Sequence, residues 1–65
     1  MKRQFREYLL EFTYVGRYVK VSAIDPETNT EVSIVGAAAA TEAELKRVAV
    51  RKLEYVLAKN LRVRT

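Results

Sequence analysis

The sequence predicts an α+β domain, in which a three-stranded antiparallel meander is followed by one C-terminal helix packed on one face of the sheet (βββα). Apolar and polar residues alternate along most of the stretch from Glu7 to Val35, which is the period of a strand. From Thr41 to Asn60 apolar residues recur every three or four positions, which is the period of a helix. The 65 residues suit a single small domain over 1–65, with an ordered core expected at about 7–60.

The first strand is expected from Glu7 to Val15, with its large residues at even positions. Gly16 and Arg17 fit a two-residue hairpin turn with glycine at the first central position. If Val15 and Tyr18 flank this turn, the inner residues of the first strand meet apolar partners, whereas a shift of one residue would turn polar side chains inward. The expected pairs are Tyr14 with Val19, Phe12 with Val21, and Leu10 with Ala23.

The second strand is expected from Tyr18 to Ile24 and the third from Glu31 to Val35. Between them, Asp25 before a proline is typical of a type I turn, and Asn29 can adopt the left-handed conformation that returns the chain. The third strand is expected to end at Gly36. The same inner face then continues through the pairs Ala23 with Val32 and Val21 with Ile34, and Asp25 lies opposite Thr30.

The helix is expected from Thr41 to Asn60. Thr41 and Glu44 fit a capping box, and Ala37–Ala40 then forms a short connection, although an earlier helix start within the alanines is the alternative. The apolar arc covers roughly 160°, wider than the roughly 100° of an ordinary surface helix, which indicates that more than a thin sheet covers it. The stripe consists of Leu45, Ala49, Leu53 and Val56, widened by Val50, Leu57 and Leu61.

These assignments predict the core. Large inner residues of the strands and the central stripe of the helix should pack together, because both are apolar on one face only. The expected members are Tyr8, Leu10, Phe12, Tyr14, Val19, Val21, Ala23, Val32, Ile34, Leu45, Ala49, Leu53 and Val56.

The composition argues against enzymatic chemistry. The chain has no cysteine and no histidine, which removes most zinc sites, the commonest general base and the usual catalytic triads. The carboxylates Asp25, Glu27 and Glu31 cluster near one hairpin, where turn chemistry explains them. We therefore expect a non-enzyme with no catalytic, cofactor or metal site. No apolar run is long enough for a membrane span and the N-terminus carries charges, so a cytoplasmic protein without membrane contact is expected.

The net charge of +4 is unevenly distributed. Residues 1–6 carry +3, residues 7–45 carry −5 and residues 46–65 carry +6. An acidic sheet joined to a basic helix is typical of a nucleic-acid-binding helix or of copies whose opposite faces attract. The candidate nucleic-acid contacts, on the side of the helix away from its stripe, are Arg47, Arg51, Lys52 and Lys59, with Tyr55 among them.

The outer face of the sheet is the second candidate surface. In the predicted register it carries two apolar clusters that no element of the fold covers, which favours a homodimer or a protein partner over nucleic acid. Exposed edges of the first and third strands also allow strand addition. The candidate interface residues are Leu9 beside Ile24, then Tyr18 and Val35 with Val15, and on the helix Val50, Leu57 and Leu61.

The run VKVSAIDPETNTEVSIVG (Val19–Gly36), followed by the basic helix, resembles a family of short uncharacterised proteins of alphaproteobacteria. The resemblance covers roughly residues 8–59. In that family glycine is usual where this chain has Asn29, and proline is common where it has Ala37. The family is a domain of unknown function, so the resemblance implies no functional residues.

A second resemblance concerns the strand order and the spacing of Lys46, Arg47 and Ala49. Both are similar to the second half of a double-stranded RNA-binding domain. That family places basic residues at the start of this helix, where this chain has Glu42 and Glu44, and it has a preceding helix that is absent here.

Overall fold

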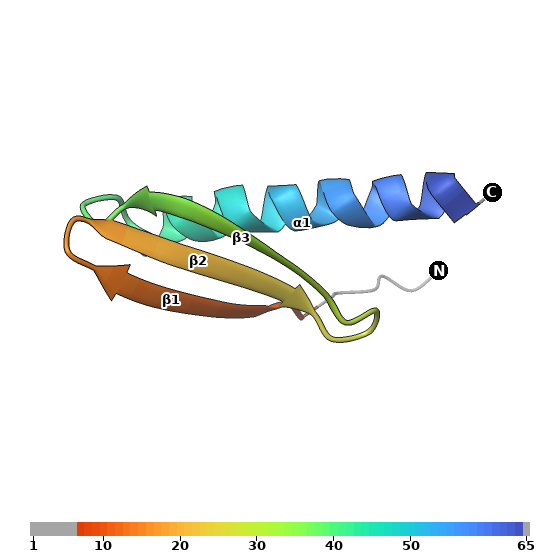
Figure 1. The fold of residues 1–65 in the computed structure, drawn as a ribbon, viewed down its shortest axis with the longest axis horizontal. Coiled ribbons are helices and arrows are strands. Elements are labelled where there is room, and N and C mark those ends of the chain that lie inside the picture. Colours follow the sequence, from red (N-terminus) through yellow and green to blue (C-terminus); the bar gives the residue numbers. More distant parts are fainter. Residues whose placement is uncertain (1–6, 65) are drawn as a thin grey trace.

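A computed structural model of the chain describes the backbone of residues 7–64 and the side chains of residues 7–60. Three strands form one antiparallel sheet in the order β1-β2-β3, and a single helix lies along one face (Figure 1). The elements are β1 (Leu9–Val15), β2 (Tyr18–Asp25), β3 (Thr30–Ala37) and α1 (Glu42–Arg64). The predicted βββα arrangement is confirmed.

The register of the sheet is the predicted one. Tyr14 pairs with Val19 across the first hairpin, and Val21 pairs with both Phe12 and Ile34. Gly16 has φ of 59° and Asn29 has φ of 61°, so each turn has a residue that tolerates the left-handed region at the position where the chain needs it. Turn chemistry and inner-face apolarity therefore specify the same pairing.

The ends of several elements differ from the prediction. β1 begins at Leu9 rather than Glu7, and β2 reaches Asp25. β3 runs from Thr30 to Ala37 and so contains Gly36 instead of ending there. The helix continues to Arg64, past the predicted end at Asn60, because neither glycine nor proline interrupts the sequence between them.

The start of the helix shows one of the two hydrogen bonds of the predicted capping box. The Glu44 amide donates to Thr41 Oγ1 at 3.1 Å, and the Leu45 amide donates to the Thr41 carbonyl at 3.0 Å. A side-chain oxygen thus satisfies an amide that has no partner within the helix. The alanines form the turn before the helix, with the Ala40 amide bound to the Ala37 carbonyl, so the later of the two possible starts is confirmed.

The buried core is smaller than predicted. It consists of Val19, Val21, Ala23, Val32, Leu45, Ala49 and Leu53. Tyr8, Leu10, Phe12, Ile34 and Val56 are half-buried against it, as are Ala40 and Leu57. The prediction for Tyr14 is wrong, since its side chain is 49% exposed.

The lateral position of the helix explains the exposure of Tyr14. α1 packs against β2 and β3 and has no comparable contact with β1. The inner side chains of β2 and β3 are small enough for a close approach, and a methyl group at Gly36 would lie 2.5 Å from Leu45 Cδ2. β1 instead carries larger side chains on its inner face: Phe12 is half-buried against the core, and Tyr14 is 49% exposed.

Candidate interaction surfaces

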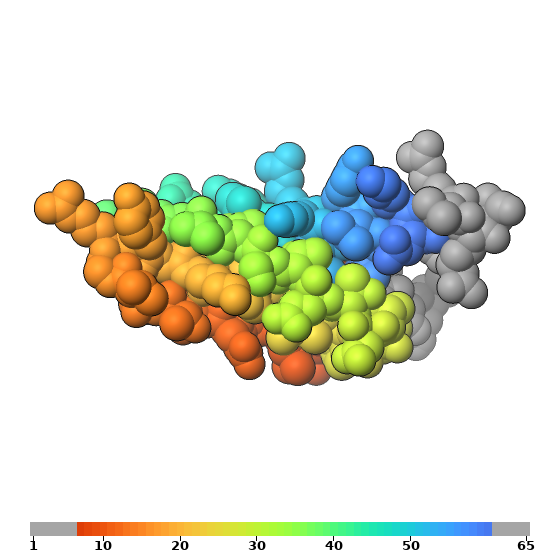
Figure 2. Space-filling model, viewed as in Figure 1, coloured from red at the N-terminus to blue at the C-terminus, as the bar shows by residue number. Residues whose placement is uncertain are grey.

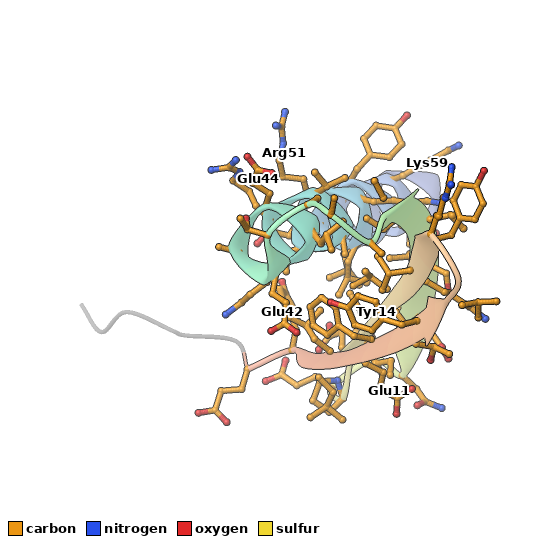
Figure 3. All side chains as sticks on the ribbon, turned by 90° about the vertical axis from the view of Figure 1, so that its left-hand side faces the viewer. Glu11, Tyr14, Glu42, Glu44, Arg51 and Lys59 are labelled. Carbon is orange, nitrogen blue, oxygen red and sulfur yellow. The ribbon has the colours of Figure 1, made fainter. Side chains whose placement is uncertain are left out.

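The fold has two layers, and no described residue covers the second face of the sheet. The principal extents of 42 × 26 × 15 Å leave room for one sheet and one helix, because packed layers lie about 10 Å apart. The space-filling view shows the green β3 segment in close contact with the first half of the helix (Figure 2). From the end of the molecule, Glu11 points away from the helix on the outer face (Figure 3).

Large apolar side chains lie on this outer face. Leu9 is 55% exposed, Val15 67%, Tyr18 65% and Val35 71%. Leu9 pairs with the half-buried Ile24, and Val15 pairs with Tyr18, which gives two apolar groups. Val35 pairs with Lys20 and lies diagonal to Tyr18. The two groups lie at opposite ends of β1. Polar residues separate them, including Ser22 and Ser33, whose hydroxyl oxygens are 3.2 Å apart.

The flank of the helix beside β1 is the next surface. Tyr14 and Glu42 point toward each other in Figure 3, and the Tyr14 hydroxyl donates to Glu42 Oε2 at 3.5 Å. The Tyr8 hydroxyl donates to Glu54 Oε2 at the same distance. Both bonds are long and exposed, so they hold β1 to the helix only weakly.

Three helix residues were predicted to belong to the interface. Val50 and Leu57 neighbour Glu54 on the helix surface and therefore lie on the flank that faces β1. Val50 is half-buried, and Leu57 is packed against the core. Leu61 lies in the helix, but its side chain is outside the described residues.

The two edges of the sheet present different backbone groups. In an antiparallel pair, residues alternate between those that exchange backbone hydrogen bonds and those whose N–H and C=O groups point away. A two-residue hairpin at Gly16 and Arg17 makes Val15 and Tyr18 a hydrogen-bonded pair. Outward-pointing backbone groups therefore belong to Leu10, Phe12 and Tyr14 on β1, and to Glu31, Ser33 and Val35 on β3.

A lysine occupies the β3 edge. Lys52 Nζ donates to the Ser33 carbonyl at 2.9 Å, across the edge that the helix overhangs. A charged side chain at a sheet edge hinders pairing with another strand. This contact was not predicted, although the helical projection places Lys52 next to the apolar stripe, which is the signal that could have revealed it.

The remaining basic residues lie on the outer surface of the helix. Arg51 and Lys59 point away from the sheet in Figure 3. Arg47 is exposed, and Tyr55 is 67% exposed. Of the four predicted nucleic-acid contacts, Arg47, Arg51 and Lys59 thus share the outer surface, and Lys52 lies at its β3 border.

Asp25, one of the carboxylates clustered near the second hairpin, is held by hydrogen bonds within the turn. Asp25 is 1% exposed, and its carboxylate accepts hydrogen bonds from the Glu27 amide and the Thr28 hydroxyl, each at 3.1 Å. Its carbonyl accepts from the Asn29 amide at 2.7 Å.

In the part of the chain that the structure describes, no three histidine, cysteine, aspartate or glutamate side chains gather as metal ligands would. None of the described helices has the length and apolarity needed to cross a bilayer.

These features define a small two-layer βββα domain in which residues 7–60 leave one sheet face and the β1 edge uncovered. The chain belongs to the family described as a domain of unknown function (DUF6898), whose model matches residues 5–60. The resemblance to a family without an assigned function is thereby confirmed. Comparisons with curated proteins and with solved structures found no match.

Proposed function

We propose that this protein is a non-enzymatic interaction module that works by self-association. The observation that carries the proposal is the uncovered apolar surface of the sheet, with four large side chains between 55% and 71% exposed on one face. A 65-residue chain buries only about 60% of its unfolded surface, which is less than a larger domain buries. Burial of apolar surface against a second copy would therefore add to its stability. Clustered exposed apolar residues are typical of protein interfaces.

Sedimentation of the full chain from low to high micromolar concentration tests the proposal. We expect a species of twice the 7.5 kDa mass to grow with concentration. Val15→Thr should weaken this association, because it removes an exposed apolar side chain while keeping a β-branched residue. Val48→Thr is the matched control, since Val48 is 49% exposed on the helix. A strict monomer at every concentration would contradict self-association.

A second candidate function is nucleic-acid binding by the helix. Tyr55, 67% exposed, lies one helical turn from both Arg51 and Lys59, which gives a surface able to contact phosphates and stack on a base. Titration with RNA and with duplex DNA at low salt tests it. Binding should weaken steeply with added salt and should fall in the Arg47→Glu/Arg51→Glu variant. Equal affinity of this variant and the parent chain would dismiss the candidate.

The setting of the module is part of the same proposal. We infer that the protein comes from alphaproteobacteria, which is supported by the resemblance of residues 19–36 and of the basic helix. We also infer that it is cytoplasmic, which is supported by the lack of an apolar run long enough for a membrane span. Fractionation of cells producing the tagged full chain tests the location, and recovery with the membrane or the periplasm would count against it.

A further inference from the structure

We propose that two copies of this chain join through the edges of their β1 strands, antiparallel and centred on Phe12, to form one continuous six-stranded sheet. This inference rests on the proposed self-association and names where and how it occurs. The contact is the open edge of β1, and it places the exposed Leu9 of one copy beside the exposed Val15 of the other on the outer face. Both helices then lie on the same side of the joined sheet.

The difference between the two edges selects β1. Lys52 covers the Ser33 carbonyl on β3, and the helix packs along that strand. Among the described residues, β1 has a strand on one side only, and the backbone groups of Leu10, Phe12 and Tyr14 point toward its other side. Main-chain hydrogen bonds to an added strand would satisfy these groups.

The alternation of the backbone restricts the register. Outward-pointing residues occupy even positions of β1, so an added antiparallel copy must place even positions opposite even positions. A two-fold axis at position 11, 12 or 13 meets this condition with the largest overlap. An axis between two residues would oppose outward-pointing groups to inward-pointing ones.

Side-chain chemistry selects the axis at position 12. There, Leu9 lies opposite Val15 of the second copy, and Glu11 lies opposite its Thr13. An axis at position 11 would oppose Glu11 to its own copy, and like charges directly opposite are unfavourable. An axis at position 13 would oppose Val15 to Glu11. Only the central choice pairs the apolar residues of the outer face with each other.

The chosen register also unites the two outer clusters. Leu9 pairs with Ile24 and Val15 pairs with Tyr18 within each copy. Across the seam, one row of the six-stranded sheet therefore reads Ile24, Leu9, then Val15 and Tyr18 of the second copy. On the inner face, Phe12 meets its own copy and Leu10 meets Tyr14, which covers side chains that the helix leaves half-exposed.

Disulfide trapping tests this register directly, because the chain has no cysteine of its own. Leu9→Cys and Val15→Cys chains are mixed and oxidised. In the proposed dimer positions 9 and 15 form a non-hydrogen-bonded pair with Cα atoms about 4.5 Å apart, within disulfide range. Two copies of either single variant place their thiols roughly 20 Å apart. We expect the mixed disulfide to predominate over both homodimeric ones.

Two further single variants report the competing registers. Glu11→Cys forms a homodimeric disulfide readily only with the axis at position 11, and Thr13→Cys only with the axis at position 13. We expect both to cross-link at least about tenfold more slowly than the mixed pair, because their Cα atoms lie beyond about 7 Å in the proposed register. Faster cross-linking of either variant than of the mixed pair would overturn the register.

Proline substitution separates this inference from the proposed function. Tyr14→Pro removes an outward N–H of β1, and Glu31→Pro removes one of β3, without loss of a bond inside the sheet. Sedimentation should show the dissociation constant raised at least about tenfold by Tyr14→Pro and unchanged by Glu31→Pro, with circular dichroism confirming that both fold. A parent chain that associates while Tyr14→Pro has no effect refutes edge pairing and leaves self-association standing. A monomeric parent chain refutes both.

Discussion

The helix packs closely against the β3 side of this sheet and only loosely against the β1 side. On the β3 side, α1 lies directly over the strand, Leu45 sits against Gly36, and Lys52 donates to an edge carbonyl. On the β1 side, Leu10 and Phe12 only partly bury against the core, and two exposed hydrogen bonds of 3.5 Å join the helix to Tyr14 and to Tyr8, which precedes the strand. One side of the domain is thus closed, and the other keeps apolar surface available.

The difference shows how side-chain size positions a helix on a sheet. The inner face of β2 and β3 narrows to Ala23 and Gly36, and Ala49 of the helix is fully buried above it. On β1, Leu10 lies level with Ala23, and Tyr14 lies level with Gly36. Small residues permit close packing, and the bulky strand is left at the margin, where a second copy can use it.

The largest loss of stability is expected from a substitution on the β3 side, which the helix covers. Leu53 is 0% exposed beneath the helix, so Leu53→Ala should lower the free energy of unfolding by about 2–5 kcal/mol. A domain of this size has about 3–10 kcal/mol in total, so the variant approaches unfolding. Phe12→Ala, on the half-covered side, should cost about half as much. Urea unfolding at low protein concentration measures both.

The comparison between these two variants is the control. The low concentration keeps association from contributing to the measured stability. If Phe12→Ala costs as much as Leu53→Ala in the monomer, β1 is as well covered as β3, and the proposed difference between the sides is wrong.

The next effect concerns the close approach at Gly36. A methyl group there meets Leu45 Cδ2 at 2.5 Å, and Leu45 is 5% exposed, so Gly36→Ala should cost about 1–3 kcal/mol through overpacking. Ala37→Val, on the exposed opposite face, is the matched control and should stay within about 0.5 kcal/mol. Both are measured by urea unfolding.

Shortening Leu45, the residue that a methyl group at Gly36 would meet, tests the cause of the Gly36→Ala effect. Adding Leu45→Val to Gly36→Ala should recover part of the loss, because the two residues share one space. Strict additivity of the two changes would show that the helix does not press on β3 at this point.

The register and the helix start could be predicted from the sequence because local signals agree with the pattern of burial. Gly16 and Asn29 adopt the left-handed conformation where the turns need it, and Thr41 caps the helix as its spacing with Glu44 predicts. The same alternation of inner and outer residues along the strands predicts the apolar clusters on the outer face. Local geometry and inner-face apolarity depend on a few neighbouring residues, so one sequence is enough to find them.

The lateral shift of the helix could not be predicted in the same way. Periodicity shows which side of a helix turns toward a sheet, but not which pair of strands it covers. That choice depends on the packing of residues distant in the sequence, such as Gly36 with Leu45. The wrong prediction for Tyr14 and the missed contact of Lys52 are both consequences of this shift.

A smaller effect is expected at the β3 edge. Lys52→Met keeps the apolar stem but removes the ammonium group that donates to the Ser33 carbonyl, so stability should fall by about 0.5–1 kcal/mol. The uncovered edge should also increase the formation of species larger than a dimer, detected by light scattering. Lys59→Met, which changes a lysine that points away from the sheet, should do neither. Equal behaviour of the two variants would mean that Lys52 does not protect this edge.

The smallest effect is expected where β1 meets the helix. The Tyr14 hydroxyl reaches Glu42 Oε2 at 3.5 Å in an exposed position, so Tyr14→Phe should change the free energy of unfolding by no more than about 0.5 kcal/mol. The substitution keeps the aromatic ring and the backbone N–H, and both edge pairing and the contact with Leu10 of a second copy need only these. Association measured by sedimentation should therefore match that of the parent chain, in contrast to Tyr14→Pro. A loss above about 1 kcal/mol would show that this bond fastens β1 to the helix, and the side described as open would then be closed as well.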